Sequence, residues 1–258
     1  MSLPDVVQGI SRAGGVLRGL GKFLELGTAT RCLACGKVIP VLQSRVMCCE
    51  QCQAELRLRK KGFCPGCGLI FTSEQEEPYF CLDCRIKSPP WQGFGFFQAY
   101  KGLLRELILA YKYEVQLGYN SLLRQLLLQA YELHLAGHID RDALVVPVPM
   151  HAQRLKQRGF NHSLELARGL CNLGLEIGPG ALQRLKPTSP QTGLGKSKRW
   201  QNLQGAFKAH KQEVRGRQVL LVDDVYTTGA TVGLCSRELL RAGARQVQVL
   251  VLARAEIG

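Results

Sequence analysis

Apolar positions in the second half of the chain change from a helical period to the continuous runs of buried strands. Apolar residues recur every three or four positions in LLRELILAYKYEV and SLLRQLLLQAYELHLAG, which predicts two core-facing helices. Short apolar runs follow in ALVVPVPM, QVLLV and QVQVLVLA, and the helical pattern TVGLCSRELLRAGA separates the last two. A strand, a helix and a strand in this order predict an α/β fold with a parallel sheet and a right-handed crossover.

The N-terminal residues show a different pattern. Six apolar residues recur at roughly helical spacing among basic residues, namely Val6, Val7, Ile10, Leu17, Leu20 and Leu24. This predicts a short amphipathic segment over residues 1–30, although four glycines favour packing or fraying over membrane binding. No uncharged apolar run approaches the roughly 18 residues that a membrane span needs, and no secretory signal is recognisable. We therefore expect a cytoplasmic protein.

Nine of the 11 cysteines lie between Cys32 and Cys84. They include four CxxC pairs, Cys32/Cys35, Cys49/Cys52, Cys64/Cys67 and Cys81/Cys84. The last two pairs repeat the first two, because every cysteine in them follows its counterpart at one constant offset. Two such turns can close a tetrahedral thiolate site around zinc, and a cytoplasmic setting disfavours disulfides. The duplication predicts a double zinc ribbon over residues 31–88 with two structural zinc ions, whose pairs are either sequential or interleaved.

Three further cysteines are not part of this pattern. Cys48 either replaces Cys49 as a ligand or, as we favour, is a small buried residue beside the site. Cys171 and Cys235 fall in predicted helices, where we expect buried, inert thiols. Four-thiolate sites leave no open coordination position, so the predicted zinc ions are expected to be structural.

The segment Val219–Thr231 combines a buried strand with candidate binding chemistry. Asp223 and Asp224 come where the strand ends, and ligands of open α/β sheets bind at the carboxyl ends of strands. The residues that follow offer hydroxyls, a flexible glycine and backbone N–H groups for a phosphate: Thr227, Thr228, Gly229, Ala230 and Thr231. The carboxylates are suited to ribose hydroxyls or magnesium, so the segment predicts a ribose 5-phosphate site.

The same segment resembles the signature of type I phosphoribosyltransferases. The resemblance implies that the two acids bind ribose hydroxyls and that the loop binds the 5-phosphate of phosphoribosyl pyrophosphate with its magnesium. The wider chain, from about residue 30 to 254, resembles the ComF family in its paired CxxC ribbons, LLRELILAYKY, VPVPMHAQRLKQRGFN and PQTGLGKSKRWQNLQGAF. That family is associated with competence and DNA uptake. Tyr226 departs from its pattern, because many relatives carry a smaller or aliphatic residue there.

The resemblance also implies a pyrophosphate-contacting loop at 147–160 and a mobile basic loop at 190–202. The formal charge of +14 agrees with this, because residues 147–217 hold 13 basic and 3 acidic side chains, a net +10. Candidate contacts to pyrophosphate are Arg154, Arg158, Lys196, Lys198 and Arg199. Asn161 and Gln191 are weaker polar candidates, and His151 and His162 are expected to be structural or exposed.

The expected protein has an N-terminal segment (1–30), the double zinc ribbon (31–88) and a phosphoribosyltransferase-like domain (91–258). If the domain is catalytic, Asp223 and Asp224 orient the ribose, while turnover and the acceptor are left open. The alternative is a non-catalytic module for DNA uptake that handles single-stranded DNA or docks a helicase-type partner through the ribbons. Zinc thiolates cancel the net +4 of residues 1–90, so the ribbons lack electrostatic support for nucleic-acid binding.

Overall fold

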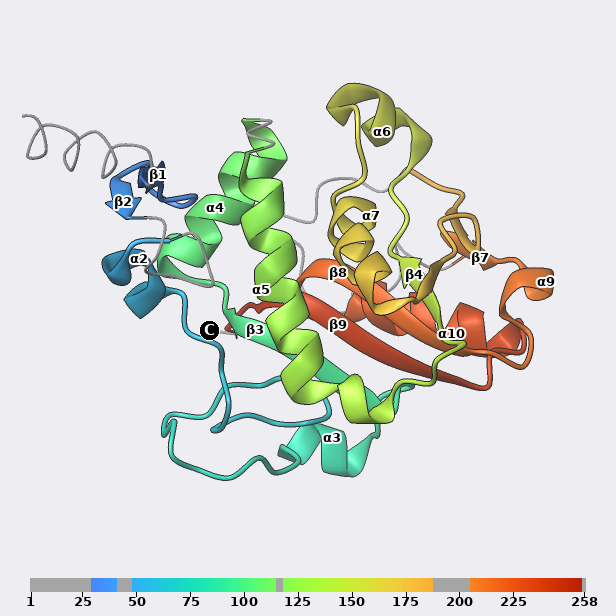
Figure 1. Ribbon diagram of the computed structural model, residues 1–258. Coiled ribbons are helices and arrows are strands. Elements are labelled where there is room, and N and C mark those ends of the chain that lie inside the picture. The colour runs from blue at the N-terminus through green and yellow to red at the C-terminus, as the bar shows by residue number, and fades with distance from the viewer. Residues whose placement is uncertain (1–28, 41–47, 115–117, 188–204, 257–258) are drawn as a thin grey trace, which may run out of the picture. The chain divides into compact units, whose positions relative to one another are not determined.

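The computed structural model describes residues 29–40, 48–114, 118–187 and 205–256 of the chain (Figure 1). It contains two compact units, Met1–Gln53 and Ala54–Gly258. Within the described ranges, no helix is both long and apolar enough to cross a bilayer.

Some of the residues predicted from the sequence lie outside these ranges. They are nearly all of the amphipathic segment over residues 1–30, together with Gln191, Lys196, Lys198 and Arg199.

The first unit holds the first cysteine repeat. Strands β1 (Ala29–Arg31) and β2 (Val38–Pro40) pair antiparallel, and helix α2 (Glu50–Glu55) begins directly after Cys49. The turn between the strands is closed by two backbone hydrogen bonds, from Cys32 N to Lys37 O (2.7 Å) and from Gly36 N to Cys32 O (2.8 Å). Gly36 has a φ of 75°, which a residue with a Cβ adopts only with strain.

The second unit is built on a five-stranded sheet with the order β3-β9-β8-β4-β5, in which every pairing is parallel. Its strands are β3 (Gly93–Ala99), β4 (Leu144–Pro147), β5 (Glu176–Ile177), β8 (Gln218–Tyr226) and β9 (Gln246–Arg254). A separate antiparallel pair is formed by β6 (Leu182–Arg184) and β7 (Phe207–Ala209). The fold class predicted from the apolar runs is confirmed, and β8 lies at the centre of the sheet.

Helices cover both faces of this sheet. The helices described in this unit are α3 (Leu82–Ile86), α4 (Gly102–Tyr113), α5 (Tyr119–His134), η2 (Ala136–His138), α6 (Ala152–Arg158), α7 (His162–Ala167), η3 (Arg168–Leu173), α9 (Lys211–Val214) and α10 (Ala230–Arg241). α5 crosses the front of β3 and β9, whereas α10 lies behind the sheet (Figure 1). Alternate strand residues such as Val219, Leu221 and Val249 form one buried cluster with Val232 and Leu239 of α10.

Strand β3 precedes the two predicted helices and was not predicted from the sequence. Gly93 and Gly95 weaken its strand pattern, but the sheet requires them. A Cβ at Gly93 would lie 2.2 Å from Gln248 Oε1, and one at Gly95 would lie 3.2 Å from Leu135 side-chain atoms. The glycines therefore let β9 and the end of α5 approach the edge strand closely.

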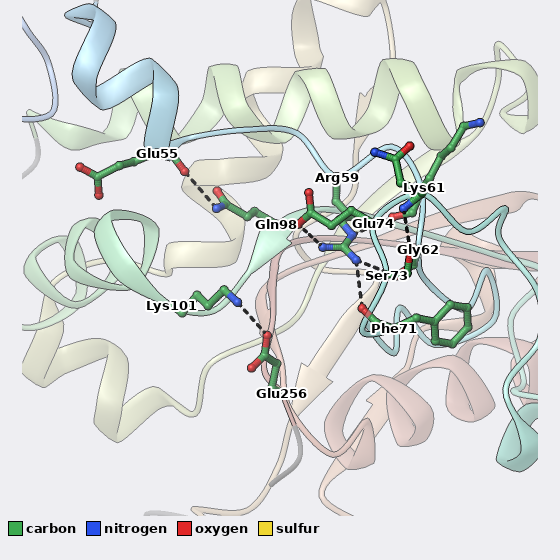
Figure 2. A network of polar contacts seen from close by, with 11 residues as sticks. Glu55, Arg59, Lys61, Gly62, Phe71, Ser73, Glu74, Gln98, Lys101 and Glu256 are labelled. Carbon is green, nitrogen blue, oxygen red and sulfur yellow. Dashed lines mark hydrogen bonds and ion pairs between the residues drawn. The ribbon is translucent and has the colours of Figure 1, made fainter.

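The second cysteine repeat belongs to the same unit as the sheet and is anchored to it by polar contacts (Figure 2). The Arg59 backbone N–H donates to Phe97 O of β3 at 2.8 Å, and the Arg59 guanidinium donates to Lys61 O, Gly62 O and Phe71 O at 2.7, 2.9 and 3.2 Å. An ion pair with Glu74 at 2.6 Å completes its environment. Arg59 thereby fixes the loop that carries this repeat.

Apolar packing also joins the second repeat to the sheet. Phe63, immediately before Cys64, is buried in the same cluster as β8 and β9. Its ring contacts Phe96 edge-on with centroids 5.2 Å apart. Residues of this repeat are thus part of the hydrophobic core of the second unit.

Candidate functional site

The carboxyl end of β8 carries two adjacent carboxylates with different partners. Asp223 Oδ1 accepts hydrogen bonds from Ser163 Oγ and from the Asp224 backbone N–H, both at 2.9 Å. Burial and then the charge of Asp224 raise the pKa of Asp223 to about 7, against the opposing effects of Lys112 and these hydrogen bonds. Asp223 is therefore only partly ionised at neutral pH without a ligand.

Asp224 has a cationic partner that the sequence did not reveal. Lys112 Nζ, from the last turn of α4, lies 2.7 Å from Asp224 Oδ2, and both side chains are only 16% exposed. Burial alone would lower the pKa of Lys112, but the Asp224 carboxylate outweighs this effect and the net shift is upward. Lys112 thus stays charged and partly neutralises the acid pair.

The loop after the acid pair leads directly into α10. Gly229, at the N-cap, has a φ of 75°, and Gly233 N donates to Gly229 O at 2.7 Å in the first turn. A Cβ at Gly229 would lie 2.2 Å from the Tyr226 hydroxyl oxygen, so the position excludes larger residues. The first N–H groups of a helix have no intrahelical partner, which makes this loop suited to an anion.

Three arginines of the second unit reach the same place. Arg154 and Arg158 come from α6 and Arg184 comes from β6, and all three line a cleft of about 440 Å³ with the acid pair, Thr227 and Thr231. The Arg158 guanidinium stacks over the ring of Tyr113 at 4.9 Å, and that ring is 66% exposed. Arg184 was not predicted, and burial followed by the charge of Arg154 lowers its pKa.

The weaker polar candidates have structural roles. The Asn161 side chain caps α7 by accepting from Ser163 N at 3.1 Å, and it donates to Val148 O at 3.1 Å. His151 caps α6 by accepting from Gln153 N at 3.3 Å. His162 is 1% exposed and lines the cleft, and burial lowers its pKa to about 4, so its ring is neutral at pH 7.

Tyr226 lies on the side of the loop from Thr227 to Thr231 that faces away from the acid pair. Its buried ring contacts Phe94 and Trp91 edge-on, with centroids 4.9 and 6.1 Å apart, and lies 4.8 Å below the Arg254 guanidinium. It lines a second cavity, of about 400 Å³, together with Gly229 and the tetrad residue Cys67. The departure from the family pattern at this position thus changes the rear of the loop, not the cleft with the acid pair.

The eight cysteines of the CxxC pairs form two groups of four in sequential order. Cys32, Cys35, Cys49 and Cys52 form the first tetrad, and Cys64, Cys67, Cys81 and Cys84 form the second. In each tetrad the four sulfurs lie within 4.8 Å of one another. The question of sequential or interleaved pairs is therefore answered in favour of two self-contained groups.

The backbone around the two tetrads repeats with the same offset as the cysteines. The bonds from Cys64 N to Leu69 O (2.8 Å) and from Gly68 N to Cys64 O (2.8 Å) match those of Cys32 and Gly36. In each repeat the second CxxC pair begins at the N-terminus of a short helix, α2 or α3. The duplication in the sequence is thus a duplication of local structure.

The donor set and its spacing fit a tetrahedral metal ion. Cys35 Sγ lies 3.7 Å from Cys49 Sγ, and Cys67 Sγ lies 3.7 Å from Cys81 Sγ. Zinc with Zn–S bonds of about 2.3 Å would separate its sulfurs by about 3.8 Å. The hydrogen bond with Cys67 lowers the pKa of Cys64 to about 4, whereas burial raises the pKa of Cys84 to about 12. Full ionisation of a tetrad therefore calls for a bound cation.

The three remaining cysteines lie outside the tetrads. Cys48 is 1% exposed, and Cys49 takes the position in the first tetrad, as favoured from the sequence. Cys235 is fully buried in α10, as expected. Cys171 is exposed, so the prediction of a buried thiol was wrong there, because the chain forms a 3₁₀ helix on the surface at this point.

Comparisons with known proteins identify a matching domain family and several relatives of this chain. Residues 169–258 match the family model of the phosphoribosyl transferase domain. Competence protein F of Haemophilus influenzae is 31% identical over 221 residues, which cover 80% of this chain and 96% of the relative. DNA utilization protein YhgH of Escherichia coli K12 is 35% identical over 208 residues, covering 80% and 89%. Competence protein ComFC of Bacillus subtilis is 23% identical, covering 80% and 83%.

Among solved structures, one similar chain is the glutamine phosphoribosylpyrophosphate amidotransferase of B. subtilis, complexed with ADP and GMP. Its TM-score is 0.33 at 22% identity, and the match covers 49% of this chain and 24% of the other. A likeness at this level carries no functional inference. The near full-length match to competence protein F does identify the family, and the chain belongs to the ComF family of competence and DNA utilization proteins, with a phosphoribosyl transferase domain in its C-terminal part.

Proposed function

We propose that the protein binds phosphoribosyl pyrophosphate, with magnesium, in the cleft at the carboxyl end of β8. Asp223 and Asp224 hold the ribose hydroxyls, and Thr227 to Thr231 hold the 5-phosphate through hydroxyls and backbone N–H groups. Arg154 and Arg158 bind the pyrophosphate. Lys196, Lys198 and Arg199, which lie outside the described residues, extend this set of cations.

One observation carries the proposal. Two carboxylates, Thr227 and Thr231 of the following loop and helix start, and three arginines come from four separate elements and line the same cleft. A carboxylate pair repels a phosphate, so its presence next to the loop calls for a ligand with hydroxyls between two anionic groups. Phosphoribosyl pyrophosphate has this arrangement, and a phosphoribosyl transferase domain matches this part of the chain.

If the site turns over, the residues around it are placed for displacement of pyrophosphate from ribose. Such reactions build positive charge on the ribose ring, which the Asp223 and Asp224 carboxylates stabilise electrostatically. Arg154 and Arg158 stabilise the negative charge of the departing pyrophosphate, and magnesium bound to that group supplies further positive charge. This proposal does not assign the acceptor. We also propose that the protein acts in the cytoplasm.

We also propose that each cysteine tetrad holds one structural zinc ion. The sulfur spacing of 3.7 Å fits a tetrahedral site. Four thiolates fill the coordination shell, so the ions would stabilise the repeats without taking part in chemistry.

Calorimetry with phosphoribosyl pyrophosphate and magnesium tests the ligand assignment. The Asp224→Asn variant removes a negative charge that faces the ribose, so we expect at least about tenfold weaker binding. Asp142→Asn is the matched control, because Asp142 is exposed and lies outside the cleft. If the wild-type protein shows no binding, or if Asp224→Asn binds as tightly as the control, the site assignment fails.

A second function, handling of single-stranded DNA, is favoured by the mouth of the cleft. The exposed ring of Tyr113 stacks with Arg158, and aromatic and guanidinium planes of this kind stack with bases. The relatives named for competence and DNA utilization support it. We expect affinity for single-stranded DNA to fall steeply with salt and to be reduced by phosphoribosyl pyrophosphate. Salt-independent or absent binding would exclude this role.

A further inference from the structure

Arg254, the last residue of β9, lies between the second cysteine tetrad and the phosphate loop. Its Nε donates to Cys67 O at 2.9 Å and its Nη1 donates to Thr227 O at 3.2 Å. Nη1 also donates to Ala255 O, and the guanidinium lies over the ring of Tyr226 at 4.8 Å. The residue is 2% exposed, so these contacts are shielded from water and contribute more than surface contacts would.

Cys67 is held in place from both sides along the chain. Trp91 Nε1 donates to Gly66 O at 2.7 Å. Gly68 has a φ of 66°, and a Cβ there would lie 2.5 Å from the ring of Phe94. The Cys67 sulfur belongs to the second tetrad, so a metal ion bound there would add a further constraint on this turn.

On the other side, Arg254 contacts the residue that begins the phosphate loop. Thr227 lines the cleft with Asp223 and Asp224. Tyr226, directly before it, accepts a hydrogen bond through its carbonyl from Ala255 N at 2.8 Å. The course of the loop therefore depends on where the end of β9 and the Arg254 side chain lie.

The region between the tetrad and the loop is otherwise partly empty. The cavity of about 400 Å³ is bounded by Cys67 and Cys84 on one side and by Thr228 and Gly229 on the other. Trp91 and Tyr226 also line this cavity, and their edge-on ring contact forms a packed route beside Arg254. Arg254 spans it with two hydrogen bonds.

We infer that Arg254 is a positioning residue that makes the conformation of the phosphate loop depend on metal occupancy of the second cysteine tetrad. The expected effect on ligand binding rests on the proposed function. The coupling itself concerns the conformation of the loop without a ligand. Loss of the metal, by chelation or by oxidation of the thiols, loosens the turn at Cys67. Arg254 then loses one of its fixed acceptors and the loop becomes less ordered.

The network in Figure 2 supplies a matched control for Arg254. Arg59 is a second arginine whose guanidinium binds backbone carbonyls of the same repeat, at Gly62 and Phe71, and it has no contact with the phosphate loop among the described residues. Its side chain is 11% exposed. Arg59→Met therefore removes a guanidinium from the same repeat without removing a contact to Cys67 or to Thr227.

The duplication supplies a second matched control. Cys67 in the second tetrad corresponds to Cys35 in the first, since each is the second cysteine of the leading CxxC pair. Cys67→Ser and Cys35→Ser each remove one equivalent thiolate from one tetrad. Only Cys67→Ser is expected to act on the phosphate loop, because Arg254 binds the Cys67 carbonyl.

The test measures amide hydrogen exchange of the peptide that contains Thr227 to Thr231, in the full-length, ligand-free protein, together with its zinc content. We expect Arg254→Met and Cys67→Ser to speed exchange in this peptide at least about tenfold. Arg59→Met and Cys35→Ser should leave it within about twofold of wild type. Arg254→Met should retain both zinc ions, and Arg254→Lys, which can still donate to one carbonyl, should restore part of the protection.

Unchanged exchange in Arg254→Met, or equal effects of Cys67→Ser and Cys35→Ser, would overturn the inference. If Cys67→Ser does not fold, exchange is measured before and after removal of zinc by chelation; we expect it to rise in wild type and to change little in Arg254→Met, and equal rises in both would overturn the inference. The affinity for phosphoribosyl pyrophosphate is measured on the same variants, and we expect it to fall at least about tenfold only where exchange rises. Failure of the wild type to bind this ligand would refute the proposed function and leave the exchange result as a valid test of the coupling.

Discussion

Asp223 and Asp224 are neighbours in the chain, yet their side chains have different partners. Asp224 is paired with Lys112, whereas Asp223 has a hydroxyl and an amide as donors and faces the charge of Asp224. A charge on Asp223 is costly without a ligand because the side chain is buried beside the charge of Asp224. The protein has thus retained a strained electrostatic arrangement, as is common in binding sites.

This arrangement predicts the pH dependence of stability. The pKa of Asp223 is raised from 3.8 to about 7 in the folded state, so the folded state binds more protons than the unfolded state in that range. The free energy of unfolding therefore falls as the pH rises from about 4 to about 7. Asp223→Asn keeps an acceptor for Ser163 and cannot ionise. We expect this variant to be more stable than wild type at pH 8, by on the order of 2 kcal/mol.

Urea unfolding of both proteins at pH 4.5 and pH 8 measures this difference. The advantage of Asp223→Asn should be much smaller at the lower pH, where the wild-type carboxyl is protonated. A variant that is no more stable than wild type at pH 8 would contradict the assignment of a buried, repelled carboxylate.

The sequence predicted the acid pair and the loop because they are contiguous after a buried strand. Lys112 and Arg184 were missed because they reach the cleft from distant elements. Lys112 occupies an ordinary polar position in an amphipathic helix, and Arg184 belongs to a three-residue strand without a clear pattern. Only the tertiary fold brings such residues to the site, so a single sequence holds no local signal for them.

At the scale of elements, the junction between β8 and α10 is constrained by one glycine. Gly229 has a positive φ, and its missing side chain leaves room for the Tyr226 hydroxyl. Gly216 has a similar φ of 76°, but a Cβ there would meet nothing within 4 Å. Comparing alanine substitutions at Gly216 and Gly229 therefore separates the cost of the backbone conformation from the cost of a steric clash.

We expect Gly216→Ala to lower the free energy of unfolding by about 1 kcal/mol, through its positive φ alone. Gly229→Ala should cost about 2–4 kcal/mol, since the new methyl group also collides with Tyr226. Chemical denaturation of both variants measures the difference. Equal losses would show that Tyr226 moves aside without cost, and that the close contact at Gly229 is not a constraint.

The elements predicted correctly are those with an uninterrupted pattern. β4, β8 and β9 are continuous apolar runs buried on both faces, and α4, α5 and α10 have regular helical periods. β3 was missed because its glycines, which allow close packing, resemble a loop in the sequence. β5, β6 and β7 have two or three residues each and are formed by pairing with neighbours, which no local pattern records.

At the scale of the whole molecule, the two tetrads predict a defined metal content. We expect two zinc ions per chain by elemental analysis, and one each in Cys35→Ser and Cys67→Ser, because the tetrads are self-contained. Loss of both ions from either single variant would contradict independent sites. A wild-type content well below two would contradict the proposal of zinc in both tetrads.

Charge is unevenly distributed over the chain. Residues 147–217 hold a net +10 of the total of +14, and this segment contributes Arg154, Arg158 and Arg184 to the cleft. Among the described residues, three of the 13 basic side chains of this segment thus line the cleft. Positive charge at the cleft favours anionic ligands.

The anchoring of Phe63 in the hydrophobic core has a consequence for the evolution of the family. Two copies of a duplicated motif are initially redundant, and either is free to be lost. Here the second copy supplies core packing and the Cys67 carbonyl bound by Arg254, whereas the first belongs to a separate compact unit. Relatives that have lost one copy should therefore have lost the one equivalent to Cys32–Cys52, and the surviving copy should diverge more slowly than the rest of the N-terminal half.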